Sequence, residues 1–161
     1  MANVEQLLSV TLIAILVDLI TVSVLFFGKR GGESVRKWYK QFRTGAACMD
    51  VMSLIIASWF AVMLGRNITE QIAIVIAIQI LHDLIVGYFV KNSHPSQDTL
   101  LSMWKEYANE IGFVILLVDA LMLIATVYFS QTEFVQNMNK ETKAYAAVVF
   151  AYLLLLIIHS F

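Results

Sequence analysis

The sequence is poor in charged residues, cysteine and proline, and the low charge alone excludes several classes of protein. Only 14% of its 161 residues are charged, whereas 60% are hydrophobic and the mean hydropathy is +0.77. One soluble core of this size cannot hide so much apolar surface. With a net charge of −1, the chain also lacks the basic surplus of nucleic-acid-binding proteins. The composition therefore excludes a disordered chain, a nucleic-acid binder and an ordinary soluble enzyme, and it indicates the lipid bilayer as solvent and partner.

The motifs that carry common chemistries are missing as well. The lone cysteine, Cys48, cannot form a disulfide within the chain, and no Cys or His spacing is typical of a zinc site. A glycine-rich phosphate loop and a nucleophile elbow are also absent. We therefore expect no catalytic residues, no metal, no cofactor and no enzymatic activity.

What the sequence does contain is five long apolar stretches, four of which include a single aspartate. Each can cross a hydrocarbon layer of about 30 Å as a helix, and no strand-like alternation competes with that interpretation. We expect an all-α transmembrane bundle that forms one domain over residues 1–161. The last stretch is just long enough to span, and a helix packed partway into the bundle is the alternative. The expected spans are residues 6–28, 44–65, 71–90, 111–132 and 144–161.

The charges between these stretches predict how the chain lies in the membrane. The first and third connections hold six and two Lys or Arg residues, whereas the second and fourth hold one and two. Because basic connections stay on the cytoplasmic side, the first and third should face the cytoplasm. The N-terminus is then expected on the outer or lumenal side.

The two cytoplasmic connections combine aromatic with basic side chains, as is typical of the headgroup region. We expect residues 98–110 to form a helix along the membrane surface. The bases should bind anionic lipid headgroups or an acidic protein surface. The side chains assigned to this role are Arg36, Lys37, Trp38, Lys40 and Arg43 in the first connection, and Trp104 and Lys105 in the third.

The two halves of the chain show a weak similarity, which predicts a tandem repeat of two spans. Each unit would be an aspartate-bearing span, an aromatic and basic segment, and a second aspartate-bearing span, as in the halves of some transporters. Chance similarity between apolar segments is the alternative. The matched pairs are Asp18 and Asp83, Trp38 and Trp104, Gly45 and Gly112, and Asp50 and Asp119.

The four aspartates are the candidate functional residues, because an ionisable side chain inside a span is costly and rarely lacks a role. Counted from the span ends, all four lie roughly 7–14 Å from the cytoplasmic boundary, so we expect one acidic layer. Three interpretations remain open: a structural hydrogen-bonded cluster, a proton or cation path with His82 as relay, and a metal or catalytic site that lacks any motif. The members of the cluster are Asp18, Asp50, Asp83, Asp119, His82 and Gln79.

Part of the second half resembles a known group of proteins. The residues concerned are Gln79-Ile-Leu-His-Asp83, Lys91, Pro95, Lys105-Glu-Tyr-Ala108, Glu110, Gly112 and Asp119-Ala-Leu-Met122. They resemble a family of small multi-span membrane proteins of nucleocytoplasmic large DNA viruses, the giant-virus group. The match covers about a quarter of the chain. The turn after Lys91 lacks the family's glycine, and Ala120 stands where the family has serine.

The resemblance implies a structural protein of the virion that anchors or shapes the internal membrane beneath the capsid. Capsid or minor capsid proteins, and further copies of the chain, would be its partners. It would lie in the virion inner membrane or in a host membrane derived from the endoplasmic reticulum. The alternative function is a proton or cation channel or transporter that uses the intramembrane aspartates.

Overall fold

The computed structural model describes residues 4–28, 32–92 and 100–160. These residues form eight α-helices and no strands. In chain order the helices are α1 (Val4–Phe27), α2 (Glu33–Phe42), α3 (Thr44–Leu64), α4 (Ile68–Asn92), α5 (Leu100–Ile111), α6 (Phe113–Ser130), α7 (Glu133–Gln136) and α8 (Lys140–His159).

The number of candidate membrane spans is four, or five if a bent pair is counted. Among the described residues, α1, α3, α4 and α8 are each long and apolar enough to cross a membrane. Helices α5 and α6 pass the same test only together, and the chain bends by 101° between them. The expected all-α multi-span fold is confirmed, and α6 covers most of the fourth expected span.

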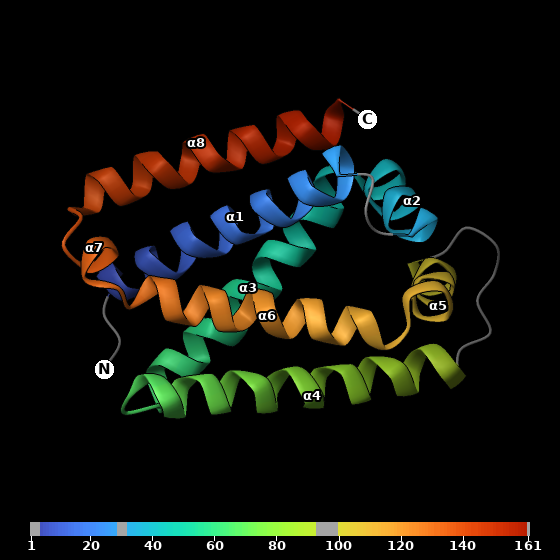
Figure 1. Cartoon of the computed structure of the whole chain (residues 1–161), viewed down its shortest axis with the longest axis horizontal. Helices are drawn as coiled ribbons and strands as arrows, with labels where there is room; N and C mark the ends of the chain where they lie inside the picture. Colours follow the sequence, from blue (N-terminus) through green and yellow to red (C-terminus); the bar gives the residue numbers. More distant parts are fainter. Residues whose placement is uncertain (1–3, 29–31, 93–99, 161) are drawn as a thin grey trace.

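Helix α1 lies at the centre of the bundle and packs against α3, α6 and α8. Nine of its residues are buried, including Ala14 and Val22, which are completely covered. Helix α4 lies at one edge and packs against α3 and α6 (Figure 1).

The short helices lie at the two ends of the bundle (Figure 1). Helices α2 and α5 pack against each other at the end where α1, α4 and α8 finish. Helix α7 and the connection from α3 to α4 lie at the opposite end, near the start of α1. The two connections with most of the positive charge therefore meet at one end.

The same order of helices occurs twice in the first six helices; the tandem repeat itself stays a prediction. Helices α1 to α3 and helices α4 to α6 each consist of a long apolar helix, a short helix and a second apolar helix. The backbone has a positive φ at Arg43, between α2 and α3, and at Gly112, between α5 and α6. Asp50 follows Arg43 by the same distance as Asp119 follows Gly112. The structure therefore aligns Gly112 with Arg43, and not with Gly45 as the sequence comparison suggested.

Candidate functional site: an acidic layer and a basic platform

The four aspartates come from four different helices and lie in a connected group. Asp50 on α3 is within electrostatic range of Asp18 on α1 and of Asp119 on α6. Asp119 is also within range of Asp83 on α4. The aspartates thus form a series from the centre of the bundle to its edge. We refer to Asp18, Asp50, Asp83 and Asp119 as the acidic layer.

Asp50 is bonded to the first short helix. The Tyr39 hydroxyl, on α2, donates a hydrogen bond of 2.6 Å to Asp50 Oδ2. Tyr39 is itself buried and packs edge-on against Phe26 of α1, with 5.7 Å between the ring centroids. Through Tyr39, α2 reaches from the end of the bundle into the acidic layer.

Asp83 has two polar neighbours on its own helix. Gln79, one turn earlier, donates from Nε2 to both carboxylate oxygens, at 2.9 and 2.8 Å. His82 Nδ1 lies 3.1 Å from Asp83 Oδ1. The sequence placed these three residues together, and the structure shows the contacts. The His82 side chain is 58% exposed, although it lies well inside a candidate span.

Asp18 differs from the other three aspartates because it has no partner. Its side chain is completely buried, and neither carboxylate oxygen accepts a hydrogen bond from any residue that the structure describes. An unpartnered buried polar group costs free energy that a structural role alone would not require. Asp18 is therefore the member of the acidic layer that most needs a functional explanation.

Helices α2 and α5 form a surface layer at the end of the bundle. The rings of Trp38 and Trp104 lie 6.4 Å apart, and Lys37 Nζ lies 3.6 Å from Glu106 Oε2. Trp38 is buried and Arg36 and Trp104 are half-buried, whereas the other bases are exposed. We call α2, the Arg43 that follows it, and α5 the basic platform; its exposed bases are Lys37, Lys40, Arg43 and Lys105.

A carboxylate to which the sequence analysis gave no structural role joins the two helices of the platform. Glu110, near the end of α5, accepts hydrogen bonds of 2.7 Å from the backbone N–H groups of Glu33 and Ser34. It thereby caps the N-terminus of α2, where N–H groups lack partners in the helix and a negative charge is favoured. No local sequence signal identifies such a cap, because the two segments are 76 residues apart.

Lys143 is a polar residue whose buried position is not evident from the sequence. We expected it in a polar connection, but α8 begins earlier, with Asn139 Oδ1 accepting a hydrogen bond of 2.7 Å from the backbone N–H of Thr142. Lys143 is 1% exposed, and its Nζ lies 3.5 Å from the carbonyl oxygen of Gln136. Its spacing to Ala147, Leu154 and Ile158, which are also buried, is the signal that places it on the inner face.

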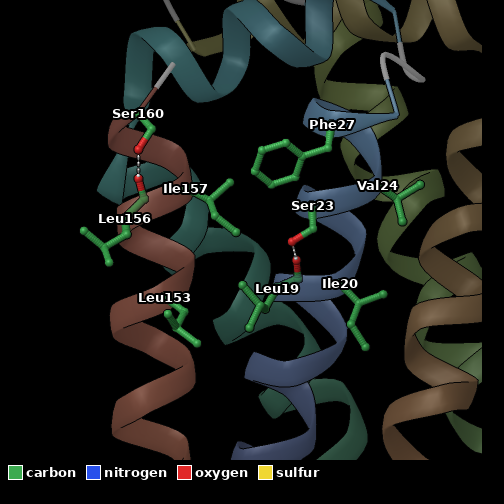
Figure 2. Close-up of a pocket in the computed structure, with 9 residues that line it drawn as sticks. All are labelled: Leu19, Ile20, Ser23, Val24, Phe27, Leu153, Leu156, Ile157 and Ser160. Carbon is green, nitrogen blue, oxygen red and sulfur yellow. Dashed lines mark hydrogen bonds between the residues drawn. The ribbon is translucent and has the colours of Figure 1, made fainter.

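An apolar groove of about 700 Å³ lies between the last turns of α1 and α8. Two serines line it, but their hydroxyls are bonded within their own helices: Ser23 to Leu19 O and Ser160 to Leu156 O, both at 2.6 Å (Figure 2). No aspartate is among the described residues that line it. The groove thus offers no free polar group to a substrate.

Neither a metal site nor a match to a known protein points to a specific function. Among the residues that the structure describes, no group of three or more His, Cys, Asp or Glu side chains could hold a metal ion. Lys29, Arg30 and Pro95 lie outside the described residues. No family model, curated protein or solved structure matches the chain. The fold and composition identify a multi-span helical membrane protein.

Proposed function

We propose that the chain is a structural membrane protein that holds a protein shell against a bilayer. The basic platform carries this proposal. Its two helices are joined by Glu110, and four of its bases are exposed. A cationic surface at the membrane boundary attracts anionic headgroups and acidic protein surfaces.

The resemblance of residues 79–122 to membrane proteins of large DNA viruses supports a specific setting. In that setting the chain lies in the virion inner membrane, or in the endoplasmic-reticulum membrane from which it derives. The platform faces capsid or minor capsid proteins on the cytoplasmic side, and the N-terminus is lumenal. The excess of Lys and Arg in the first and third connections supports this orientation.

Two measurements test the structural role. In purified membrane-containing particles, quantitative mass spectrometry should find the chain in a fixed ratio to the shell proteins. Reversing the platform charge with Lys37→Glu, Lys40→Glu and Lys105→Glu together should deplete it from the particles. Arg66→Glu, an exposed base at the opposite end of the bundle, is the matched control and should have no effect. A chain that is absent from particles but present in host membranes contradicts the proposal.

A second candidate function is transfer of protons or cations through the acidic layer. The supporting observation is Asp18, a buried carboxyl group without a hydrogen-bond partner among the described residues and within electrostatic range of Asp50. Intramembrane carboxyl groups in series are typical of proton relays. His82, exposed beside Asp83, would be the entry or exit group.

Flux measurements separate the two candidates. The interior of liposomes that contain the purified protein should acidify under an inward proton gradient only if the acidic layer conducts protons. Asp18→Asn and Asp83→Asn should then abolish the flux, while Glu133→Gln, an exposed acid on α7, should not. If no proton or cation flux is measured under either gradient, the structural role is the better explanation.

A further inference from the structure

We propose that α4 is the contact surface between two copies of this chain, with His82 and Asp83 at its centre. Helix α4 is poorly covered by the rest of the bundle. Of its 25 residues only Gln71, Val75 and Val90 are buried. The inference does not depend on the basic platform, since α4 lies along one edge of the bundle and the platform lies at its end (Figure 1).

The depth of His82 shows why this surface needs a cover other than lipid. His82 lies roughly 15 Å from the Asn92 end of α4 and about 21 Å from the Ile68 end, at 1.5 Å per residue. It is therefore close to the middle of the span, yet its side chain is 58% exposed. A polar, ionisable ring facing hydrocarbon at that depth is costly, and a histidine side chain is too short to reach the headgroups.

His82 and Asp83 can pair with the same two residues of a second copy of the chain. The Nδ1 atom of His82 is 3.1 Å from Asp83 Oδ1, and none of the described residues is bonded to Nε2. The Asp83 side chain is still 21% exposed. In a two-fold dimer within one membrane, the same patch of both copies meets at the same depth. Nε2 of one copy can then bond to the Asp83 carboxylate of the second copy, and the reverse.

Apolar side chains beside this pair complete the surface. Ile85 and Phe89 follow His82 by three and seven residues, and therefore lie on the same side of the helix. They are 48% and 62% exposed. Helices associate in membranes through close van der Waals packing and a few polar contacts, and this patch offers both.

The first experiment measures association in a bilayer. Full-length protein is labelled with donor and acceptor dyes and reconstituted in liposomes, and energy transfer is followed as lipid dilutes it. We expect a dimer that His82→Leu weakens about three- to tenfold and that His82→Asn largely restores. Tyr152→Leu, at an exposed position on α8, is the matched control and should not weaken it. A protein that is monomeric at every dilution overturns the proposal, as does equal weakening by His82→Leu and Tyr152→Leu.

The second experiment locates the contact. In a Cys48→Ser background, which removes the exposed native thiol, Ile85→Cys should give a disulfide-linked dimer on mild oxidation. Tyr152→Cys should not. Unchanged helical circular dichroism in both variants shows that the bundle is intact. Equal cross-linking at the two positions would overturn the proposal. It would mean that the copies collide at random, as expected of a monomer whose α4 is covered by water.

Discussion

The carboxylate of Glu110 accepts a hydrogen bond of 2.7 Å from the backbone N–H of Ser34, although 76 residues separate them. A second bond, from the backbone N–H of Glu33, has the same length. This pair of bonds fixes the basic platform as one unit, because it joins the end of α5 to the beginning of α2. The platform is therefore sensitive to any change that moves Glu110 or neutralises it.

Neutralising Glu110 should loosen the platform. The pKa of Glu110 lies below its ordinary value of 4.5 because the side chain and backbone N–H of Ser34, and the backbone N–H of Glu33, stabilise the charged form. Since the folded-state pKa is lowered, the stabilisation is complete above pH 4.5 and is lost as pH falls through the folded-state value. Amide hydrogen exchange at Glu33 and Ser34 should accelerate, relative to that of α8, in acid or in Glu110→Gln. The control, Glu133→Gln on α7, should not change it.

Gly32 should not tolerate a larger side chain. A Cβ atom at this position would collide with the carboxyl group of Glu110, so Gly32→Ala should displace the cap and lower the midpoint of thermal unfolding. A Cβ atom at Gly45 would meet nothing within 4 Å. Because alanine favours a helix over glycine, Gly45→Ala should leave stability unchanged or raise it by up to about 1 kcal/mol. Equal melting temperatures for the two variants would contradict the close contact.

Substitutions at Arg43 and Gly112, the two described residues with a positive φ, should change stability in opposite directions. Arg43 has φ 44° and ψ −118°, and Gly112 has φ 54° and ψ −128°. This is a conformation that favours glycine, and a residue with a side chain is strained there by about 1–3 kcal/mol. Arg43→Gly should therefore raise the free energy of unfolding in detergent by about 1 kcal/mol, and Gly112→Ala should lower it by a similar amount. Arg43→Lys should leave it unchanged.

Removing the carboxyl group of Asp18 should stabilise the bundle. Because neither oxygen has a partner among the described residues, Asp18→Leu exchanges an unsatisfied buried group for an apolar one. We expect the free energy of unfolding to rise by roughly 1–3 kcal/mol. Asp50→Leu is the comparison: it removes the acceptor of the Tyr39 hydroxyl and should lower the same quantity. If Asp18→Leu unfolds the protein, Asp18 has a structural partner after all.

Helix boundaries and their arrangement were partly predictable from the sequence. Hydropathy placed α1 and α3 within two residues at each end, because lipid-facing and core-facing side chains are equally apolar. Helix α8 begins four residues before the expected span, because Asn139 acts as its N-cap and Lys143 already lies inside the helix. Counting residues from the span ends predicts one acidic layer, and the structure brings Asp50 within electrostatic range of Asp18 and Asp119, and Asp119 within range of Asp83.

Individual contacts were not predictable in the same way. The bond from Tyr39 to Asp50 depends on how α2 folds back over α3, and the cap from Glu110 depends on α2 and α5 meeting. Hydrophobic periodicity carries no information on such long-range pairs. The isolation of Asp18 was hidden as well, because its sequence neighbours on the helix include threonines that could have been partners. In the structure Thr21 bonds instead to the carbonyl oxygen of Val17.

The cap on α2 also has a consequence for the order of events during synthesis. The segment from α1 to α3 leaves the ribosome before Glu110 is made, so the N-terminus of α2 lacks a cap while α4 to α6 are translated. The first half can insert, but its surface helix is completed only by the second half. A chain truncated after Leu64 should therefore keep two membrane helices and show a frayed α2. The first half of the chain therefore depends on the second half to complete its surface helix.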